Sequence, residues 1–154
     1  MQLSMRTDYA LRALFTLVEA YGRGPIPIRE LARRNDVPKR FLEHIMLDLK
    51  NLGWVDSLPG KAGGYFLARQ PTEIMMGEVV RCFDGYLAPI ACVSVTGYKR
   101  CTQESFCRFR RVFLDIRNHV TRVMDRASLA TVFAGAPVRD SEVANVDCID
   151  GGGI

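Results

Sequence analysis

No uninterrupted apolar run in this 154-residue sequence approaches the length of about 18 residues that a membrane-spanning helix needs. The first residues also lack the basic, then apolar, then small-residue layout of a secretory signal peptide. There is no glycine-rich phosphate loop, and no nucleophile–base pair or pair of carboxylates in a recognisable pocket setting. We therefore expect a cytoplasmic protein that is not an enzyme, takes no small-molecule substrate and has no membrane partner.

Cysteine pairs of the Cys-x-x-Cys type are missing too, although the chain has five cysteines. Zinc sites prefer two such close pairs, and disulfides are rare in a reducing cytoplasm, so neither explains these thiols well. Cys92, Cys101 and Cys107 are instead separated by eight and then five residues in a stretch with little periodicity. Three thiolates in one loop suit an iron–sulphur cluster that takes its fourth ligand from elsewhere. The alternatives are a metal-free thiol switch through direct oxidation, and three free, partly buried cysteines.

The other two cysteines are expected to be bystanders. Cys82 lies among apolar residues, which places it in the core. Cys148 lies near the end of the sequence, where we expect no ligand role.

The chain has no strong excess of one charge, because it has 21 lysines and arginines and 17 acidic residues. The distribution is more informative. Residues 1–70 carry 11 basic and 7 acidic side chains, whereas residues 135–154 carry 1 and 4. An acidic tail therefore masks a more basic body, which fits a nucleic-acid partner, although many enzymes share this balance.

Hydrophobic periodicity and turn residues predict the order of elements in the first half of the chain. The expected elements are helices at 8–21, 28–34 and 38–52 and strands at 54–58 and 65–67. Thr7 or Asp8 can cap the first helix, and a turn-rich segment at 59–64 joins the strands. Three helices followed by a hairpin is the order of a winged helix-turn-helix. The fold class is therefore mainly α, with a small β-hairpin wing and a long dimerisation helix after it.

A second helical part is expected after the hairpin. Its elements are a helix at 72–83 capped by Thr72, a loop at 84–103, a long helix at 104–126 and a short helix at 129–133 capped by Ser128. We divide the chain into a winged helix-turn-helix DNA-binding domain (1–83), a cysteine-bearing cluster loop (84–107), a dimerisation helix with a short terminal helix (104–134) and a flexible acidic tail (135–154), which we expect to be unstructured.

Apolar residues recur along the long helix at steps of three and four residues. They are Phe106, Phe109, Phe113, Ile116, Val120 and Val123. This is a narrow seam, whereas a helix that packs onto a globular core shows a wider stripe. We therefore expect a partner helix from a second copy of the chain, which makes the protein a homodimer; the alternative is that the seam packs on its own domain.

The second helix of a helix-turn-helix places its N-terminal side chains against base edges in the major groove. Here these side chains are Lys39, Arg40, Phe41 and Glu43. At the tip of the hairpin, Lys61 suits a phosphate or minor-groove contact, and Gly63 lets the backbone approach DNA. We predict binding to double-stranded DNA at a palindromic operator. The alternatives are an ordinary solvated charged face and a winged helix that binds another protein.

Several segments together resemble the Rrf family of winged helix-turn-helix transcriptional regulators, of the iron–sulphur type typified by IscR, NsrR and RirA. They are Met1-Gln-Leu-Ser, Thr7-Asp-Tyr-Ala-Leu-Arg-Ala-Leu14, Phe41-Leu-Glu-His-Ile45, Gly60-Lys-Ala-Gly-Gly-Tyr65, Gly77-Glu-Val-Val80, the three cysteines and Leu129-Ala-Thr-Val132. The likeness covers about residues 1–134. The Gly-Gly-Tyr wing together with the three-cysteine loop is specific, whereas a helix-turn-helix alone is not.

The resemblance implies a homodimeric DNA-binding repressor or activator, of which we expect a repressor. It also implies a cluster on Cys92, Cys101 and Cys107 that senses redox state, nitric oxide or iron status. Relatives that regulate cluster synthesis carry a histidine three residues after the third cysteine, where this chain has Arg110, so the fourth ligand must differ. The Thr-Asp-Tyr start, shared with nitric-oxide sensors, nominates Asp8 of the other subunit. Asp8 serves equally well as a helix cap. Three thiolates with an oxygen ligand favour a four-iron over a two-iron cluster.

Overall fold

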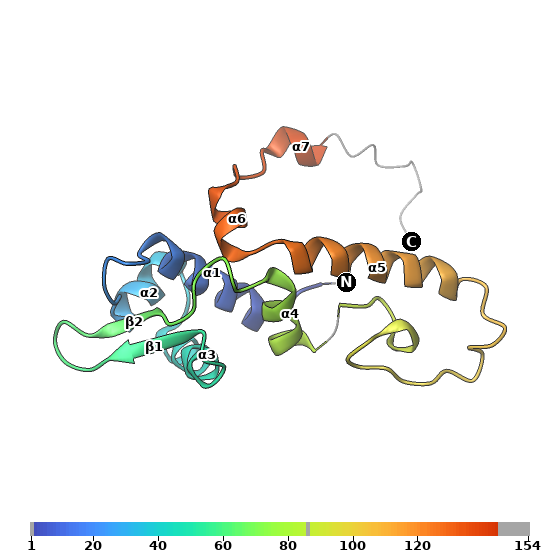
Figure 1. The fold of residues 1–154 in the computed structure, drawn as a ribbon, viewed down its shortest axis with the longest axis horizontal. Helices are drawn as coiled ribbons and strands as arrows, with labels where there is room; N and C mark the ends of the chain where they lie inside the picture. The colour runs from blue at the N-terminus through green and yellow to red at the C-terminus, as the bar shows by residue number, and fades with distance from the viewer. Residues whose placement is uncertain (1, 86, 145–154) are drawn as a thin grey trace.

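The protein is a chain of helices with one small hairpin (Figure 1). The structure, a computed structural model, describes residues 2–85 and 87–144. Its helices are α1 (Met5–Glu19), α2 (Ile28–Asn35), α3 (Lys39–Asn51), α4 (Met76–Asp84), α5 (Arg110–Arg126), α6 (Leu129–Ala134) and α7 (Asp140–Ala144), with a 3₁₀ turn η1 (Ala91–Val93) and the strands β1 (Val55–Leu58) and β2 (Gly64–Leu67). This confirms the predicted fold class. None of the described helices combines the length and apolarity that crossing a membrane requires.

Helix α1 is the centre of the core. Leu14 and Leu17 are buried, and α2, α3, α4, α6 and β2 all contact this helix. The prediction that Thr7 or Asp8 caps it is wrong, because Ser4 is the cap and its Oγ accepts a hydrogen bond of 3.2 Å from the Thr7 backbone N–H. The helix starts before its apolar pattern does, so Thr7 becomes a buried residue of the first turn.

Helices α2 and α3 form the predicted helix-turn-helix. Asp36 ends α2 in the left-handed conformation, with φ of 52°, which aspartate tolerates better than most residues. Pro38 then directly precedes α3. Leu42, Ile45 and Leu49 are buried, as their spacing predicts, so the opposite face of α3 is left at the surface. Leu52, which continues the same spacing and is predicted on the buried face, is instead 43% exposed, and α3 ends before it.

The wing has a third, very short segment that the sequence pattern did not predict. Strands β1 and β2 pair antiparallel, with Leu58 opposite Gly64. Ile26, which precedes α2, bridges to Tyr65, and each backbone N–H donates a 2.8 Å hydrogen bond to the other's carbonyl oxygen. Gly64 permits this approach, because a Cβ there would lie 2.3 Å from the carbonyl carbon and oxygen of Ile26. The wing is thereby fixed to the helical core.

Helix α4 begins later than predicted. It starts at Met76, because residues 71–73 form a turn in place of a helical turn capped by Thr72. The carboxylate of Glu78 instead accepts a 3.0 Å hydrogen bond from the Met75 backbone N–H and so caps the helix.

The prediction that Cys82 lies in the core is also wrong, because its side chain is exposed. Gly77, Val79 and Val80 are the buried residues of this short helix, and Cys82 is not among them. Partial desolvation and the nearby Glu78 carboxylate raise the pKa of the Cys82 thiol, so burial and charge both disfavour its thiolate.

Helix α5 begins at Arg110, six residues after the predicted start. Residues 102–106 form turns, in which the backbone N–H of Glu104 donates to the carbonyl oxygen of Cys101 over 3.2 Å. Arg110 forms an ion pair with Glu104. Residues six apart on a continuous helix lie about 9 Å apart along the axis and about 120° apart around it. The chain must therefore turn back between the two for this pair to form.

Helix α5 lies beside α4 and extends away from the winged helix (Figure 1). Arg81 on α4 and Asp125 on α5 form an ion pair of 2.8 Å. The helices approach closely at Gly77, where a Cβ would lie 2.0 Å from the Oδ1 atom of Asp125. The far end of α5 therefore carries the cysteine loop at a distance from α3 (Figure 1).

Ser128 caps α6 as predicted, because its Oγ accepts a 3.1 Å hydrogen bond from the Thr131 backbone N–H. Beyond α6, the prediction of an unstructured tail is wrong for residues 140–144, which form α7. Two acidic residues lie in the first turn of α7, where the helix dipole favours them. Cys148 and the rest of the predicted tail lie outside the described residues.

Candidate functional site

The three predicted cysteine ligands line one cavity. It has a volume of about 720 Å³ and lies between the cysteine loop and the N-terminal end of α5, with Cys92, Cys101 and Cys107 in its wall. Cys101 is exposed and the other two are half-buried. The charged residues of the wall are Lys99, Arg100, Glu104 and Arg108. Positive charge therefore prevails around the thiols, which favours an anionic group there.

The donor set of this cavity fits an iron–sulphur cluster, because cluster iron takes thiolate ligands readily. Among the described residues, no three His, Cys, Asp or Glu side chains are close enough to one another to hold a metal ion. The three cysteines thus share a cavity wall without converging on one point. Ligation requires the loop to draw them together.

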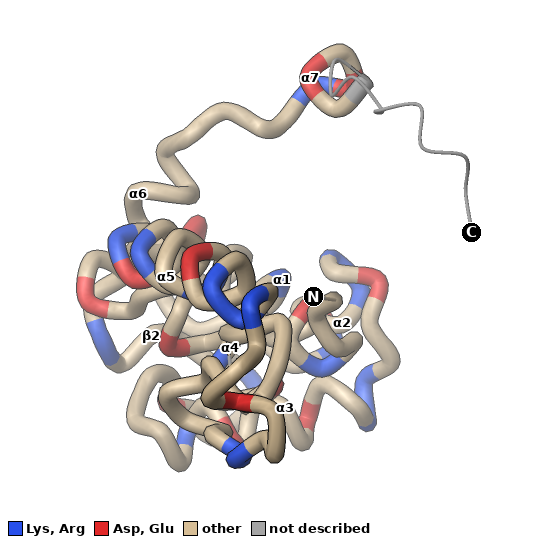
Figure 2. The backbone as a smooth tube through the Cα atoms, turned by 90° about the vertical axis from the view of Figure 1, so that its right-hand side faces the viewer, with Lys and Arg blue, Asp and Glu red and all other residues tan. Residues whose placement is uncertain are grey.

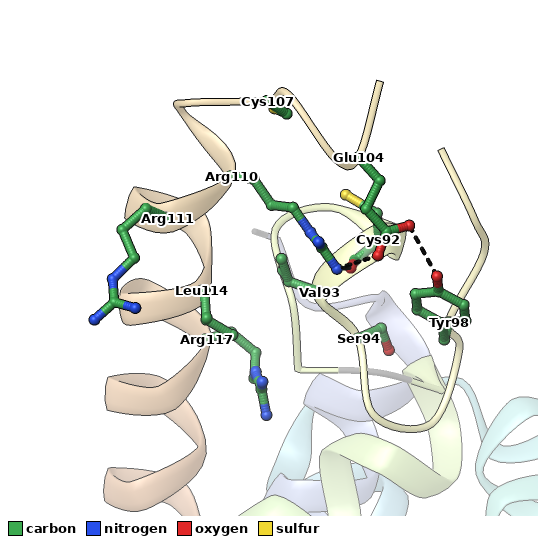
Figure 3. Close-up of a pocket in the computed structure, with 10 residues that line it drawn as sticks. All are labelled: Cys92, Val93, Ser94, Tyr98, Glu104, Cys107, Arg110, Arg111, Leu114 and Arg117. Carbon is green, nitrogen blue, oxygen red and sulfur yellow. Dashed lines mark hydrogen bonds and ion pairs between the residues drawn. The ribbon is translucent and has the colours of Figure 1, made fainter. Parts of the chain in front are cut away.

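A polar clasp, formed by Tyr98, Glu104 and Arg110, closes the loop onto α5 (Figure 3). The Tyr98 hydroxyl donates a 2.8 Å hydrogen bond to Oε2 of Glu104, and Arg110 pairs with Oε1 of the same carboxylate. Arg110 also donates from Nη2 to the carbonyl oxygen of Cys92 over 2.9 Å. The segment around Cys92 and the segment around Glu104 are therefore both connected to the first residue of α5.

The clasp shifts the pKa values of its two acids in opposite directions. The hydrogen bond from Tyr98, assisted by the charge of Arg110, holds the pKa of Glu104 below its ordinary value despite some desolvation. The same hydrogen bond raises the pKa of Tyr98. At neutral pH Glu104 is charged and Tyr98 is protonated, which are the forms that the clasp requires.

Sequence reasoning did not single out Tyr98 or Glu104. One signal was available, because Glu104 lies three residues after Cys101 and three before Cys107. That spacing is informative only if the segment turns, whereas the apolar period predicted a straight helix from residue 104.

Asp8, the predicted fourth ligand, lies on α1 and does not line the cysteine cavity of its own chain. Its carboxylate pairs with Arg12 over 2.7 Å. A ligand role for Asp8 therefore needs the cluster of a second subunit, as the sequence interpretation assumed, and it stays a prediction.

Helix α5 has three distinct faces. The face toward its own chain carries Arg110, Leu114, Arg117, Thr121 and Asp125, which line the cavities between α5, α4 and the loop or pair with α4. The predicted seam lies about 120° around the helix from this face, at 100° per residue. The third face carries charged and polar residues, including the Arg111–Asp115 pair. Figure 2 shows basic and acidic positions interspersed along α5.

The seam is unpartnered within the described part of the chain. Helix α5 has no buried residue, and Ile116 and Val123 are 41% and 53% exposed. Phe106 and Phe109 precede the helix and are even more exposed, and Val112, which the seam prediction missed, adds to the apolar surface. The remaining seam residues, Phe113 and Val120, are half-buried. The alternative in which the seam packs on its own domain is therefore not what the structure shows.

The predicted DNA-contacting residues of α3 lie at its exposed N-terminal end. Lys39 pairs with Glu43 over 3.1 Å, four residues on, so these two charges partly satisfy each other. Arg40 is exposed and forms no ion pair among the described residues. Phe41 is 46% exposed and contacts the ring of Tyr9 edge-on at 5.7 Å between centroids.

At the wing, Lys61 is exposed but Gly63 is buried. A Cβ on Gly63 would lie 2.1 Å from the carbonyl oxygen of Leu58. The turn itself therefore requires glycine at this position, and the predicted DNA contact of Gly63 stays a prediction.

The comparisons with known proteins agree with this geometry. The family described as Rrf2, iron-dependent transcriptional regulator, matches residues 3–135. An rrf2-like HTH-type transcriptional regulator of Rhodobacter capsulatus is 37% identical over 138 residues, which cover 86% of this chain and 92% of that protein. The HTH-type transcriptional regulator NsrR of Geobacillus kaustophilus is 32% identical over 130 residues, which cover 84% and 88%.

A solved structure shares the fold. That of CymR, the global cysteine regulator of B. subtilis, aligns with a TM-score of 0.74 at 24% identity and covers 89% of this chain and 99% of that one. The relatives are regulators and not enzymes, as the sequence predicted. The extent of the family match, together with the helix-turn-helix, the hairpin and the long helix, shows that this chain belongs to the Rrf2 family of transcriptional regulators.

Proposed function

We propose that the protein is a homodimeric repressor that binds a palindromic DNA operator and is controlled by an iron–sulphur cluster on Cys92, Cys101 and Cys107. The observation that carries the proposal is that these three thiols line one basic cavity at the end of α5. The same helix displays an exposed apolar seam that suits a second copy. The description of the family as iron-dependent supports iron as the metal.

When bound, a four-iron cluster would supply a centre that reacts with oxidants or nitric oxide and depends on iron supply. The residues of this chain would hold it and report its presence. Besides the three cysteines, we keep Asp8 of the partner subunit as a predicted ligand. Lys99, Arg100 and Arg108 line the same cavity and would offset the negative charge of thiolates and cluster.

A continuous set of contacts connects the loop to the DNA-reading helix. Arg110 joins the loop to α5, and the Arg81–Asp125 pair joins α5 to α4. On α1, the guanidinium of Arg6 lies over the ring of Phe83 from α4, 5.5 Å from its centroid, and also pairs with Asp48 of α3. A rearrangement of the loop can thus reach α3, and a useful switch needs a coupling of about 1–3 kcal/mol.

The cluster is tested by replacing Cys101 with alanine. Protein purified without oxygen should be brown, and Cys101→Ala should lose its visible charge-transfer absorption and most of its iron. Cys82→Ala is the matched control, since that thiol is exposed but does not line the cavity, and it should keep both signals. A colourless, iron-free wild-type protein under these conditions contradicts the proposal.

A metal-free thiol switch is the second candidate, and it is favoured by the lack of a converged ligand set among the described residues. An oxidant such as peroxide would convert one thiolate to a sulfenic acid, and a second thiol could condense with it to a disulfide, releasing water. Mass spectrometry after mild peroxide, on protein shown to contain no iron, distinguishes this candidate from the cluster.

DNA reading is tested by replacing Arg40 with alanine. Arg40 is exposed at the start of α3, where a bidentate contact to guanine is possible. Arg40→Ala should weaken binding to an operator selected from genomic fragments by about 1–3 kcal/mol, and weaken binding to random DNA much less. Lys61→Ala is the comparison. Loss of a phosphate contact should weaken binding to the operator and to random DNA alike, and should reduce the salt dependence of both. Equal losses for Arg40→Ala would make Arg40 a phosphate contact as well.

A further inference from the structure

We propose that Glu104 supplies the fourth ligand of the cluster from the same chain as the three cysteines, an inference that rests on the function proposed above. The cluster site would then be complete within one subunit, and Glu104 would take the position predicted for Asp8 of the partner subunit. The inference is carried by the position of Glu104 in the turns between Cys101 and Cys107 and by the cavities that it shares with all three thiols.

The local backbone places Glu104 on the same side as Cys101. The segment reads Cys101-Thr-Gln-Glu104-Ser-Phe-Cys107, so the carboxylate lies three residues from each thiol. Residues 102–106 form turns with hydrogen bonds of the i to i+3 kind, from the Glu104 N–H to the Cys101 carbonyl and from the Phe106 N–H to the Gln103 carbonyl. The first of these turns runs from Cys101 to Glu104, and residues three apart in such a turn lie on the same side of the chain.

The cavities lead to the same conclusion. Glu104 lines the 720 Å³ cavity with Cys92, Cys101 and Cys107, a 530 Å³ cavity with Cys101, and a 410 Å³ cavity with Cys92 and Cys107. Among the described residues that line the largest of these, Glu104 is the only carboxylate, and there is no histidine. Carboxylate oxygens are ordinary ligands of iron, so Glu104 alone adds a fourth donor to the thiols.

The clasp holds Glu104 in a state from which ligation is possible. Tyr98 donates to Oε2 and Arg110 pairs with Oε1, so each oxygen has one recorded partner. A carboxylate offers about four lone-pair sites, which leaves about one free on each oxygen. Arg110 is a permanent cation without an acceptor and cannot ligate iron. We assign to Tyr98 and Arg110 the positioning of the Glu104 carboxylate.

The experiment compares three single substitutions in the full chain, each reconstituted without oxygen from iron and sulphide beside the wild type. Glu104→Gln removes the anionic ligand at constant size, Tyr98→Phe removes only its hydrogen bond, and Asp8→Asn removes the ligand predicted from the partner subunit. The readouts are the rate at which EDTA bleaches the visible absorption, and the Mössbauer spectrum of the one iron without a cysteine ligand.

We expect Glu104→Gln to raise the bleaching rate about 100-fold and to change the Mössbauer spectrum of that one iron. An increase of this size is at the upper end of what the loss of an outer-shell partner causes. Tyr98→Phe should raise the rate only about 10-fold, the lower end of the range for an outer-shell loss, and should leave the spectrum of that iron unchanged. Asp8→Asn should bleach at the wild-type rate, because the site needs no ligand from the partner subunit. Glu104→Cys should restore slow bleaching, because a thiolate at that position again ligates iron.

Two outcomes overturn this inference while leaving the proposed function intact. In one, Tyr98→Phe has the same bleaching rate and the same spectrum as Glu104→Gln. Loss of a non-ligand would then be as damaging as loss of Glu104, which would mean that Glu104 only shapes the loop. In the other, Asp8→Asn bleaches quickly and Glu104→Gln does not, which assigns the fourth ligand to the partner subunit. A wild-type protein that takes up no cluster at all contradicts the proposed function itself, and the inference with it.

Discussion

Replacing Ile116 and Val123 together by aspartate is expected to convert the protein to a monomer and to abolish high-affinity operator binding. Both side chains lie on the seam of α5 and are 41% and 53% exposed in the single chain. In a dimer they would be buried, and each substitution would lose apolar burial and place a carboxylate in the interface. We expect the dimer to lose about 4 kcal/mol or more, which is about 1,000-fold in its dissociation constant.

The measurement is the mass in solution over a range of protein concentrations, together with operator affinity. The matched control is Asn118→Asp with Arg122→Gln, which changes the net charge by the same amount on the exposed polar face of α5. The control should stay dimeric. Because α5 has no buried residue in the single chain, the aspartate variant should keep its helical circular dichroism. An aspartate variant that remains a dimer would show that the seam is not the interface.

Gly64→Ala is expected to destabilise the winged helix by about 2–4 kcal/mol. A Cβ at this position would lie 2.3 Å from the carbonyl carbon and oxygen of Ile26 and 2.6 Å from the nitrogen of Pro27. Backbone atoms cannot yield as a flexible side chain can. The substitution must therefore separate Ile26 from Tyr65 and break their two 2.8 Å hydrogen bonds, each worth about 1 kcal/mol. The wing should also shift and weaken DNA binding.

The free energy of unfolding in urea measures this effect, at one protein concentration because a dimer's stability depends on it. Gly60→Ala is the matched control at the tip of the same wing. Gly60 has a φ of 102°, and a Cβ there would have no heavy atom within 4 Å. It should cost only about 1 kcal/mol of conformational strain. If the two variants lose equal stability, the contact with Ile26 does not determine the wing's position.

Much of the winged helix was predictable because its signals are local. The steps from Leu42 to Leu49 identify the buried face of α3, and Pro38 marks its start. The turn residues between the strands predict the hairpin in its observed place. The bridge between Ile26 and Tyr65 could not be predicted in this way, because it joins segments 39 residues apart and leaves no periodic signal.

The wrong predictions about α5 and Cys82 have the same cause, which is contacts that leave no periodic signal in the sequence. The apolar period of the seam continues through Phe106 and Phe109, and it predicted a helix from residue 104. The chain turns there instead, because Glu104 is bound by Tyr98 and Arg110, and such ion pairs and hydrogen bonds do not appear in a hydrophobic pattern. Cys82 was assigned to the core from its apolar neighbours, but the side of α4 that faces the core is decided by packing against α1 and α5.

The sequence by itself determined the fold class, the order of helices and hairpin, the family and which three cysteines lie in one loop. These rest on local periodicity, turn residues and motif spacing, which operate over a few residues along the chain. Only the tertiary structure decided that the three thiols share one basic cavity, that Glu104 lies in the same wall, and that the seam of α5 has no partner within the described chain. The cavity depends on turns and polar contacts within the loop, and the exposure of the seam depends on how α5 packs against the rest of the chain. Neither leaves a signal in the hydrophobic pattern.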